Sequence, residues 1–338
     1  MTCGLPARPP EEGARVVALS YLDQAAAARP RLKDEDDAEA LHDFRVALRR
    51  LRSWLRAYDD LLKDSVPGKL ARRLKRLAGA TGPGRDAEVQ LEWLRGRSSQ
   101  LSLQQRQGLA WIVARLHGRM RDAYGDLQKE IERDFPDLDG DLRRKLSVYR
   151  TQVFLGPGSP PSTLGKVTAP ILRVQVDDLE VHLAQVEQAD DKEQAHRARI
   201  SAKRVRYLLE PFAEDLPEAG PVIKRFKALQ DVLGDLHDSH VLEDELTKAV
   251  EEAAAERTRR VLELSLADSP DPVRLRAESR RPRESGLIAL ARQNRDRRDR
   301  LFATLETEWL HGKADELLRD VAALGEKMAG DQYAPPSV

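Results

Sequence analysis

Apolar residues recur three and four positions apart along almost the whole chain, a spacing that places them on one face of an α-helix. The alternation of β-branched and polar residues that is typical of a strand never extends over more than a few positions. The sequence therefore predicts an all-α protein. The predicted helices cover residues 12 to 28, 36 to 63, 67 to 79, 84 to 97, 102 to 134, 138 to 153, 169 to 188, 192 to 213, 218 to 256 and 286 to 327.

Proline and glycine divide this helical pattern into two parts. The stretch from Gly156 to Thr163 contains three prolines and two glycines, which break a helix. We therefore predict a first helical repeat at 12–153, a linker at 154–168 and a second repeat at 169–327. The ends, 1–11 and 328–338, are expected to be flexible tails. The polar, proline-containing stretch 265–285 is expected to be irregular.

The two parts share an internal repeat. The segment HDFRVALRRLR at 42–52 recurs as HRARISAKRVR at 196–206, with matched residues 154 positions apart. A second block follows in both parts at an offset of 152. In it Arg72, Arg73, Lys75, Leu77, Gly82 and Asp86 correspond to Lys224, Arg225, Lys227, Leu229, Gly234 and Asp238. Two blocks in the same order indicate a duplicated unit.

The repeated segment carries a basic stripe along one helix. At about 100° per residue, His42, Arg45, Arg49, Arg52 and Arg56 fall within a sector of roughly 80°. The apolar face centres roughly 100° away, so the stripe borders the buried face and can line a groove between neighbouring helices. The second copy preserves this sector with His196, Arg199, Lys203 and Arg206, while Arg50 and Arg204 lie outside it.

The overall charge does not reveal these stripes. Lysine plus arginine and aspartate plus glutamate both number 57, which gives a formal net charge of zero. Segments 41–56, 69–76, 197–206 and 224–227 nevertheless carry net charges of +4, +5, +5 and +3. Like charges three or four positions apart repel by a few tenths of a kcal/mol per pair in water, and by more in a partly desolvated groove. Two such rows favour an anion between them, and planar guanidinium groups match phosphate oxygens.

We therefore predict that cations of both halves line a groove that holds an extended chain of phosphates. Asp86 and Asp238 are predicted to support this site by accepting hydrogen bonds from stripe arginines or by capping a helix. No catalytic residues, metal or cofactor are expected. The predicted polyphosphate-binding residues are His42, Arg45, Arg49, Arg50, Arg52, Arg56, Lys69, Arg72, Arg73, Arg76, His196, Arg199, Lys203, Arg204, Arg206, Lys224 and Lys227.

With these residues the chain resembles the CHAD family, the conserved histidine α-helical domain, whose pattern is His-x-x-Arg-[Val/Ile]-x-x-[Arg/Lys]-Arg-x-Arg in each half. The resemblance covers nearly the whole chain and includes a later Leu-x-x-x-x-Gly-x-x-x-Asp element, from Leu77 to Asp86. It implies two four-helix bundles related by a pseudo-twofold axis, a basic central cavity and binding of inorganic polyphosphate, often at polyphosphate granules. The binding residues that it implies are His42, Arg45, Arg49, Arg52, His196, Arg199, Lys203 and Arg206.

The chain departs from the family pattern in three ways. Many members carry a β-stranded triphosphate tunnel domain, for which this sequence has no strand pattern, so no attached polyphosphatase activity is expected. Pro83 stands where the second repeat has Asp235 or its neighbour, so the local turn is expected to differ. Gln230 has no polar equivalent at Ala78. The two halves are therefore not expected to contribute equally.

Different roles for these residues remain open at this point. The arginines could pair with carboxylates of neighbouring helices and only hold the bundle together. His42 with His196, or His237 with His240, could be metal ligands, although the arginine rows would repel a cation. Protonated imidazoles could instead bind phosphate more tightly in mild acid. The Gly165-Lys166-Val167 segment lacks the glycine and hydroxyl positions of a phosphate loop.

Different functions for the whole chain also remain open. Basic grooves attract nucleic acid, but no aromatic residues interleave with the stripes to stack bases. The chain could also be a metal-dependent enzyme that processes phosphate chains, a protein scaffold, or a binding protein for shorter ligands such as inositol pyrophosphates. Cys3 is the only cysteine, so an intramolecular disulfide is excluded, and no apolar run approaches the roughly 18 residues that span a bilayer. A cytoplasmic protein is expected.

Overall fold

The computed structural model describes residues 4–34, 37–148, 162–280 and 282–330, and these residues form helices without strands. The first half contains η1 (Leu5–Ala7), α1 (Pro10–Arg31), α2 (Ala38–Ala57), α3 (Asp59–Leu62), α4 (Gly68–Ala80), α5 (Gly82–Leu94), η2 (Arg97–Gln100) and α6 (Arg106–Leu146). The second half contains α7 (Leu164–Ala184), α8 (Lys192–Leu209), η3 (Glu210–Phe212), α9 (Ala219–Ser265), α10 (Pro272–Ser279), α11 (Pro282–Leu305), η4 (Glu306–Leu310) and α12 (Lys313–Ala329). The prediction of an all-α protein is confirmed for the described residues.

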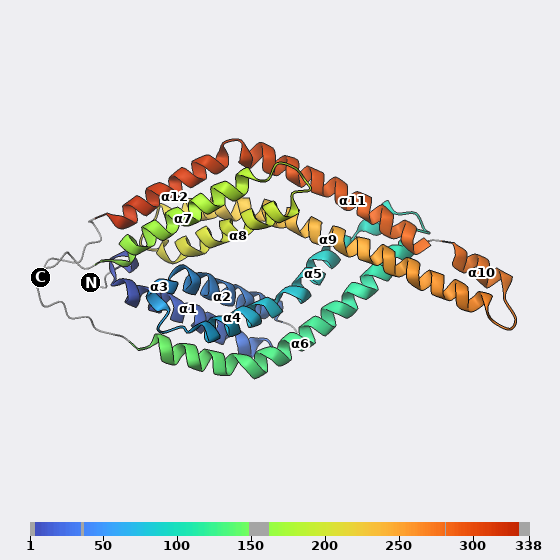
Figure 1. Cartoon of the computed structure of the whole chain (residues 1–338), viewed down its shortest axis with the longest axis horizontal. Helices are drawn as coiled ribbons and strands as arrows, with labels where there is room; N and C mark the ends of the chain where they lie inside the picture. The colour runs from blue at the N-terminus through green and yellow to red at the C-terminus, as the bar shows by residue number, and fades with distance from the viewer. Residues whose placement is uncertain (1–3, 35–36, 149–161, 281, 331–338) are drawn as a thin grey trace, which may run out of the picture.

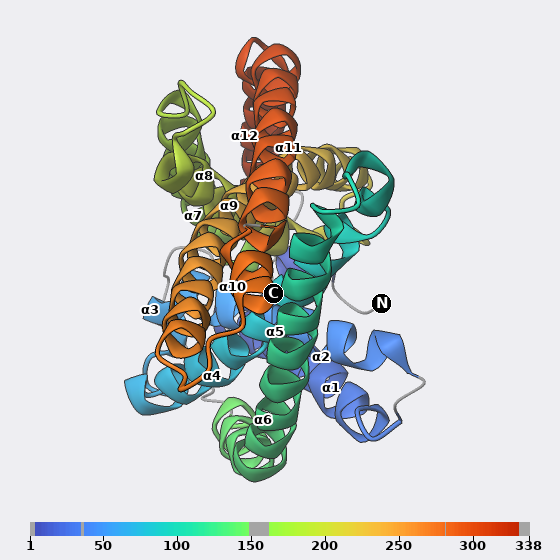
Figure 2. The same ribbon diagram turned by 90° about the vertical axis from the view of Figure 1, so that its right-hand side faces the viewer.

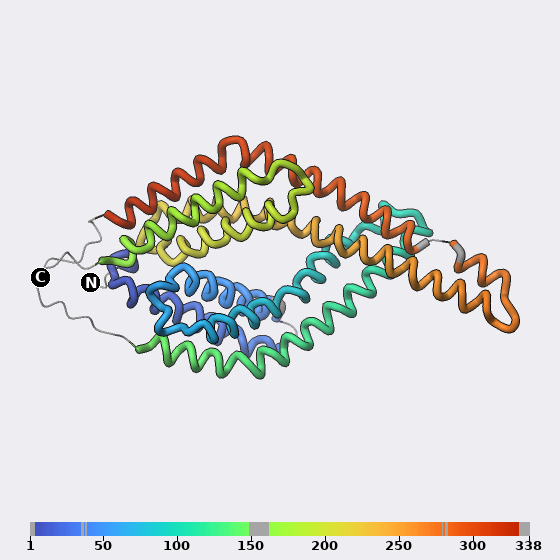
Figure 3. Tube along the Cα trace, in the orientation of Figure 1, coloured from blue at the N-terminus to red at the C-terminus, as the bar shows by residue number. Residues whose placement is uncertain are grey.

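The helices form two layers, which contact each other through α1 with α7 and α2 with α8 and also pack together at one end of the molecule. In Figure 1, α1, α2 and α4 lie below with the C-terminal part of α6, and α7, α8 and α12 lie above with the N-terminal part of α9. The long helices α6 and α9 then run to the right, where they pack with α5 and α11. Figure 2 views this end, with α6, α9, α10 and α11 towards the viewer. The hairpin of α9 and α10 projects beyond it (Figure 3).

Two apolar cores hold the layers together, and both draw on the two halves of the sequence. The larger core joins α1, α2, α4 and the end of α6 to α7, α8, α12 and the start of α9. The smaller core lies where the long helices meet. It combines Leu91, Leu109, Ile112 and Leu116 of the first half with Leu242, Leu246, Leu287 and Leu290 of the second. The halves are therefore interlocked at the far end.

The predicted break near residue 135 was wrong, because α6 continues through Pro136. The proline removes one backbone donor from the helix, a cost of about 3 kcal/mol in a typical interior. Its ring is exposed, while Ile131, Phe135 and Leu138 stay in register on the buried face. Apolar burial on both sides of the proline therefore keeps the helix continuous.

Other helix boundaries also differ from the prediction. The expected helix 36–63 is divided at Tyr58 into α2 and α3, and Asp37 caps α2 by accepting from the backbone N–H groups of Glu39 and Ala40. The helix expected at 286–327 is divided by a π-helical turn, η4, and by Gly312, whose φ of 121° only glycine adopts readily.

The segments that were expected to be loops or tails are partly helical. Helix α7 begins at Leu164, inside the expected linker, with Thr163 as its N-cap, and α9 extends to Ser265. The stretch 265–285, which was expected to be irregular, contains α10. Within the expected N-terminal tail, the backbone N–H of Leu5 donates to Asp215 Oδ2 at 2.8 Å. Most of the linker (154–161) and residues 331–338 lie outside the described part of the chain.

Candidate functional site

The two helices that carry the basic stripes pack directly against each other. Helices α2 and α8 are in contact, and both bury an apolar face. Phe44, Leu48 and Leu51 are fully buried on α2, as are Ala202 and Val205 on α8. Nearby, the Trp54 and Phe212 rings lie 6.1 Å apart and join the two halves. The stripes therefore lie on neighbouring helices whose apolar faces are buried.

Seven of the predicted cations form what we call the α2–α8 cation cluster. None of them forms an ion pair or a hydrogen bond with any residue that the structure describes. Arg45 is only 9% exposed, and its Nε atom is buried without a partner, as is the Nε atom of Arg199. The members of the cluster are Arg45, Arg49, Arg52 and Arg56 of α2 and Arg199, Lys203 and Arg204 of α8.

These cations affect one another's protonation. Burial lowers the pKa of Arg45 to about 10, with repulsion from Arg49 and Arg85 as the next causes. Burial also lowers the pKa of Lys203 to about 6, and the charges of Arg199 and Arg49 add to the effect. Because Arg49 of α2 repels Lys203 of α8, the two stripes form one electrostatic unit. An anion placed among them would relieve both the repulsion and the lost hydration.

Asp86 of α5 and Asp238 of α9 lie beside this cluster. Burial raises the pKa of each carboxyl group, and attraction to Arg199 is the largest opposing cause in both. Neither carboxylate accepts a hydrogen bond from a described residue, and the N-caps of α5 and α9 are Thr81 and Glu218. The expected roles as hydrogen-bond acceptors or caps are therefore not seen, and the two groups act through longer-range attraction.

Several other predicted cations are paired with carboxylates instead. The Nε atoms of Arg50 and Arg206 lie 2.8 and 3.2 Å from the two carboxylate oxygens of Glu210, in ion-pair contact without hydrogen-bond geometry. Arg73 pairs with Asp141 at 3.0 Å, and Arg76 pairs with Glu130 and Asp134. A purely structural role thus fits these four arginines. Lys69, Arg72, Lys224 and Lys227 are exposed on α4 and α9.

The repeated histidines have different surroundings in the two halves. The Nδ1 atoms of His196 and His237 lie 3.3 Å apart, so one ring donates and the other accepts. Burial, followed by repulsion from Arg199, lowers the pKa of both, that of His237 to about 3. His196 is therefore uncharged at neutral pH, and phosphate binding through its protonation in mild acid is disfavoured. No three His, Cys, Asp or Glu residues in the described ranges are grouped to hold a metal.

His42 is exposed, and Arg85 takes the repeat position of His237. His42, Arg45 and Arg85 line a cavity of about 480 Å³ together with Tyr124 and Gln128. Arg85 pairs with Glu88 at 2.7 Å. Sequence reasoning missed Arg85, although the 152-residue offset placed it opposite His237, and it weighed His237 only as a metal ligand, not as the neighbour of His196.

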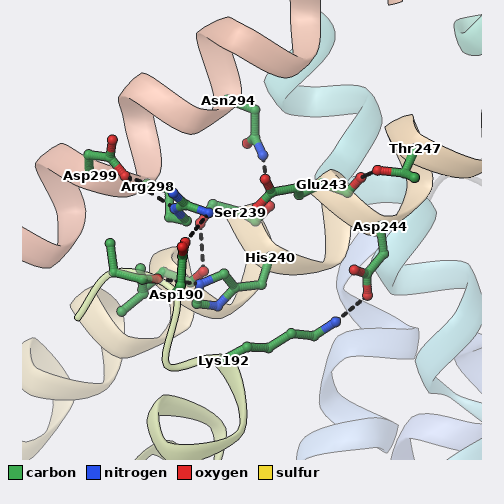
Figure 4. Close-up of polar contacts among 12 residues, drawn as sticks. Asp190, Lys192, Ser239, His240, Glu243, Asp244, Thr247, Asn294, Arg298 and Asp299 are labelled. Carbon is green, nitrogen blue, oxygen red and sulfur yellow. Dashed lines mark hydrogen bonds and ion pairs between the residues drawn. The ribbon is translucent and has the colours of Figure 1, made fainter. Parts of the chain in front are cut away.

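A buried polar network fixes the loop that precedes α8 (Figure 4). Arg298 of α11 is 5% exposed and pairs with Asp190 at 2.6 Å and with Glu243 of α9 at 2.9 Å. His240 Nε2 lies 2.8 Å from the backbone oxygen of Ala189. The side-chain amide of Asn294 donates to the backbone oxygen of Ser239 at 2.8 Å. These contacts join the loop to α9 and α11, and so set where the stripe of α8 begins.

Comparisons with known proteins agree with the resemblance seen in the sequence. Among the solved structures that share the fold are the following two. The crystal structure of the CHAD domain from the plant Ricinus communis is 19% identical, with a TM-score of 0.61, and the alignment covers 96% of this chain and 95% of that one. PptA from Streptomyces chartreusis is 16% identical, with a TM-score of 0.59, over 89% of this chain and all of that one.

No match was found among the curated proteins. None of the described helices is long and apolar enough to cross a membrane. The sequence model of the CHAD domain matches residues 17–247, which is more than half of the chain and includes both stripes. The chain therefore belongs to the CHAD domain family.

Proposed function

We propose that this protein binds inorganic polyphosphate without cleaving it, in a groove lined by the α2–α8 cation cluster. The observation that carries the proposal is that seven cations from both repeats gather beside one another without a carboxylate partner among the described residues, with two buried guanidinium Nε atoms unsatisfied. An unpaired charge becomes costly as it is withdrawn from water, so a cluster that includes the buried Arg45 and four half-buried cations favours an anion that binds them. Membership of the CHAD family supports the same ligand.

A phosphate chain suits this cluster for two physical reasons. It presents one negative charge after another, so a single ligand neutralises cations on both helices. Its oxygens also accept from guanidinium groups in pairs, and arginine stays charged even where burial lowers its pKa. Binding through many such contacts would gather the protein at polyphosphate granules in the cytoplasm.

The first test is binding of labelled polyphosphate at about 150 mM salt, where counterion release still leaves specific contacts measurable. The double variant Arg49→Ala with Lys203→Ala removes one cluster cation from each helix. Each lost charged contact is worth roughly 1.5–3 kcal/mol, so affinity should fall at least tenfold. The control is Arg76→Ala with Arg144→Ala, which removes two cations that pair with acids of α6. Equal losses in both variants would mean that net charge alone drives binding.

Two further measurements separate polyphosphate binding from nucleic-acid binding and from catalysis. Single-stranded DNA of similar charge should bind at least several-fold more weakly, because the cluster offers no aromatic stacking surface. Polyphosphate incubated with the protein and Mg²⁺ or Mn²⁺ should keep its length. Release of phosphate under these conditions would assign an enzymatic function instead.

A further inference from the structure

The two copies of the repeat differ in charge at one position near the α2–α8 cation cluster. The sequence repeat aligns Arg50 with Arg204, Arg52 with Arg206 and Arg56 with Glu210. An arginine in the first half is thus replaced by a carboxylate in the second. Glu210 stands in η3, immediately after α8 and four residues beyond Arg206. The repeat therefore predicts the same neighbours at both ends, but with opposite charge at one position.

At the second-half end, Glu210 neutralises its neighbours. Its carboxylate oxygens Oε1 and Oε2 lie 3.2 Å from Arg206 Nε and 2.8 Å from Arg50 Nε. The side chain of Glu210 is only 16% exposed, so solvent screens these pairs weakly. One carboxylate thus binds one guanidinium from each stripe helix, which is the arrangement that a phosphate group would take.

At the first-half end, no carboxylate of a described residue is in ion-pair contact with the corresponding arginines, and Asp178 attracts Arg204 only at longer range. Arg52, Arg56 and Arg204 form no ion pair with any residue in the described ranges. Burial lowers the pKa of Arg52 and of Arg204, and Arg56 is the next cause in each case. Three cations therefore face one another where the other end has two cations and a carboxylate.

We propose that Glu210 is an internal anion that occupies the phosphate position on Arg50 and Arg206, so that a bound polyphosphate chain leaves the cluster at the Arg52, Arg56 and Arg204 end. This inference rests on the proposed function. A phosphate placed on Arg50 or Arg206 must displace Glu210 or lie beside its negative charge, and either is unfavourable. The two ends of the binding site are thus unequal although the sequence is repeated. Glu210 limits the length of polyphosphate that the site holds.

The direct test is Glu210→Gln, which keeps the shape of the side chain and removes its charge. Freed from the carboxylate, Arg50 and Arg206 become available to phosphate, so affinity for long-chain polyphosphate should rise about tenfold, as for a gained charge-assisted contact. The plot of log affinity against log salt should become steeper by about one to two phosphate contacts. The matched control is Glu214→Gln, which removes an exposed carboxylate four residues away and should change affinity less than twofold.

A reciprocal variant tests the end formed by Arg52, Arg56 and Arg204, and it leaves Glu210 unchanged. Arg56→Glu places a carboxylate at the repeat position of Glu210, beside Arg52 and Arg204. It should lower affinity for polyphosphate at least tenfold more than Arg144→Glu, an identical charge change on the exposed end of α6. Thermal unfolding of each variant checks that it folds. If Glu210→Gln does not fold, the comparison of Arg56→Glu with Arg144→Glu still tests the proposal.

The outcomes separate this inference from the proposed function. If the wild-type protein does not bind polyphosphate, the proposed function fails. If the wild type binds but Glu210→Gln matches both wild type and Glu214→Gln, only the role of Glu210 is overturned. Equal effects of Arg56→Glu and Arg144→Glu would overturn it as well. A rise with Glu210→Gln and a selective loss with Arg56→Glu support it.

Discussion

The cations of the basic segments differ in whether a carboxylate contacts them. Arg45 and Arg76 come from the same kind of basic segment, yet Arg45 is buried without a partner and Arg76 is 59% exposed and paired with two acids of α6. The sequence repeat pointed to the two stripes, and their role as a binding site stays a prediction. The repeat could not separate paired from unpaired cations, because the acids that pair with Arg50, Arg73 and Arg76 stand far away in the chain and are brought near only by the fold.

For Glu210 the sequence showed the charge of the residue but not its contacts. The repeat alignment placed it opposite Arg56, and its difference in charge was visible in the sequence. Its contact with Arg50, however, depends on how α2 packs on α8. Arg85 and His237 were likewise present in the aligned block, but only the fold shows their surroundings.

The low pKa of Lys203 predicts that binding takes up a proton. At about 6, this pKa leaves the free side chain mostly neutral above pH 7. It results from burial and from Arg199, Arg49 and Arg206, while Asp238 opposes it. A phosphate beside the amine restores the charge, so polyphosphate binding at pH 7.5 should take up close to one proton and strengthen as pH falls from 8 to 6. Calorimetry in buffers of different ionisation enthalpy measures this uptake.

The variant Lys203→Arg provides the comparison, since a guanidinium stays charged and has no proton to gain. Its proton uptake should be smaller by most of one proton, and equal uptake in both proteins would contradict the assignment. The low pKa of Lys203 also determines how the stability of the free wild-type protein changes with pH. Because the unfolded lysine binds its proton up to about pH 10.5, this residue makes the free energy of unfolding rise with pH between about 6 and 10.5.

At the scale of helices, the hydrophobic period located most elements but not their lengths. The predicted break at Pro136 and the predicted end at residue 256 were both wrong, since α6 and α9 continue past them. Local signals such as proline favour a boundary, whereas burial against distant helices decides whether it occurs. The contact of α6 with α11 joins the two halves and had no local signal at all.

The contact between α6 and α11 depends on Gly108 and Gly286. A Cβ atom on Gly286 would lie 2.1 Å from the backbone oxygen of Gln105 and 3.0 Å from Gly108 Cα. Because both are backbone atoms, Gly286→Ala forces α11 away from α6 and should lower the free energy of unfolding by about 1–3 kcal/mol. Thermal or urea unfolding measures the change.

Gly118 of α6 is the matched control, because a Cβ atom there meets nothing within 4 Å. Gly118→Ala should raise the free energy of unfolding by up to about 1 kcal/mol through helix propensity alone. If both alanine variants shift stability in the same direction, close packing at the crossing of α6 and α11 does not explain the glycine at 286.

At the scale of the molecule, the sequence repeat and the folded cores divide the chain differently. The repeat predicts two units separated by a linker, and that division stays a prediction. The smaller core draws Ile112 and Leu116 from one half and Leu246 and Leu290 from the other. The larger core also continues from α1 and α2 into α7 and α8. Each half therefore buries part of its apolar surface against the other.

This interlocking predicts that neither half folds alone. Residues 1–153 expressed without 154–338 would expose one side of both cores, and each buried Leu or Ile side chain loses about 1.5–3 kcal/mol on exposure. Several such losses exceed the stability of a typical domain. Each half should therefore unfold without a cooperative transition, and mixing the two should restore cooperative unfolding by circular dichroism together with polyphosphate binding. A cooperative transition in either isolated half would instead establish the repeat as an independent domain, and the shared core as a docking surface between two such domains.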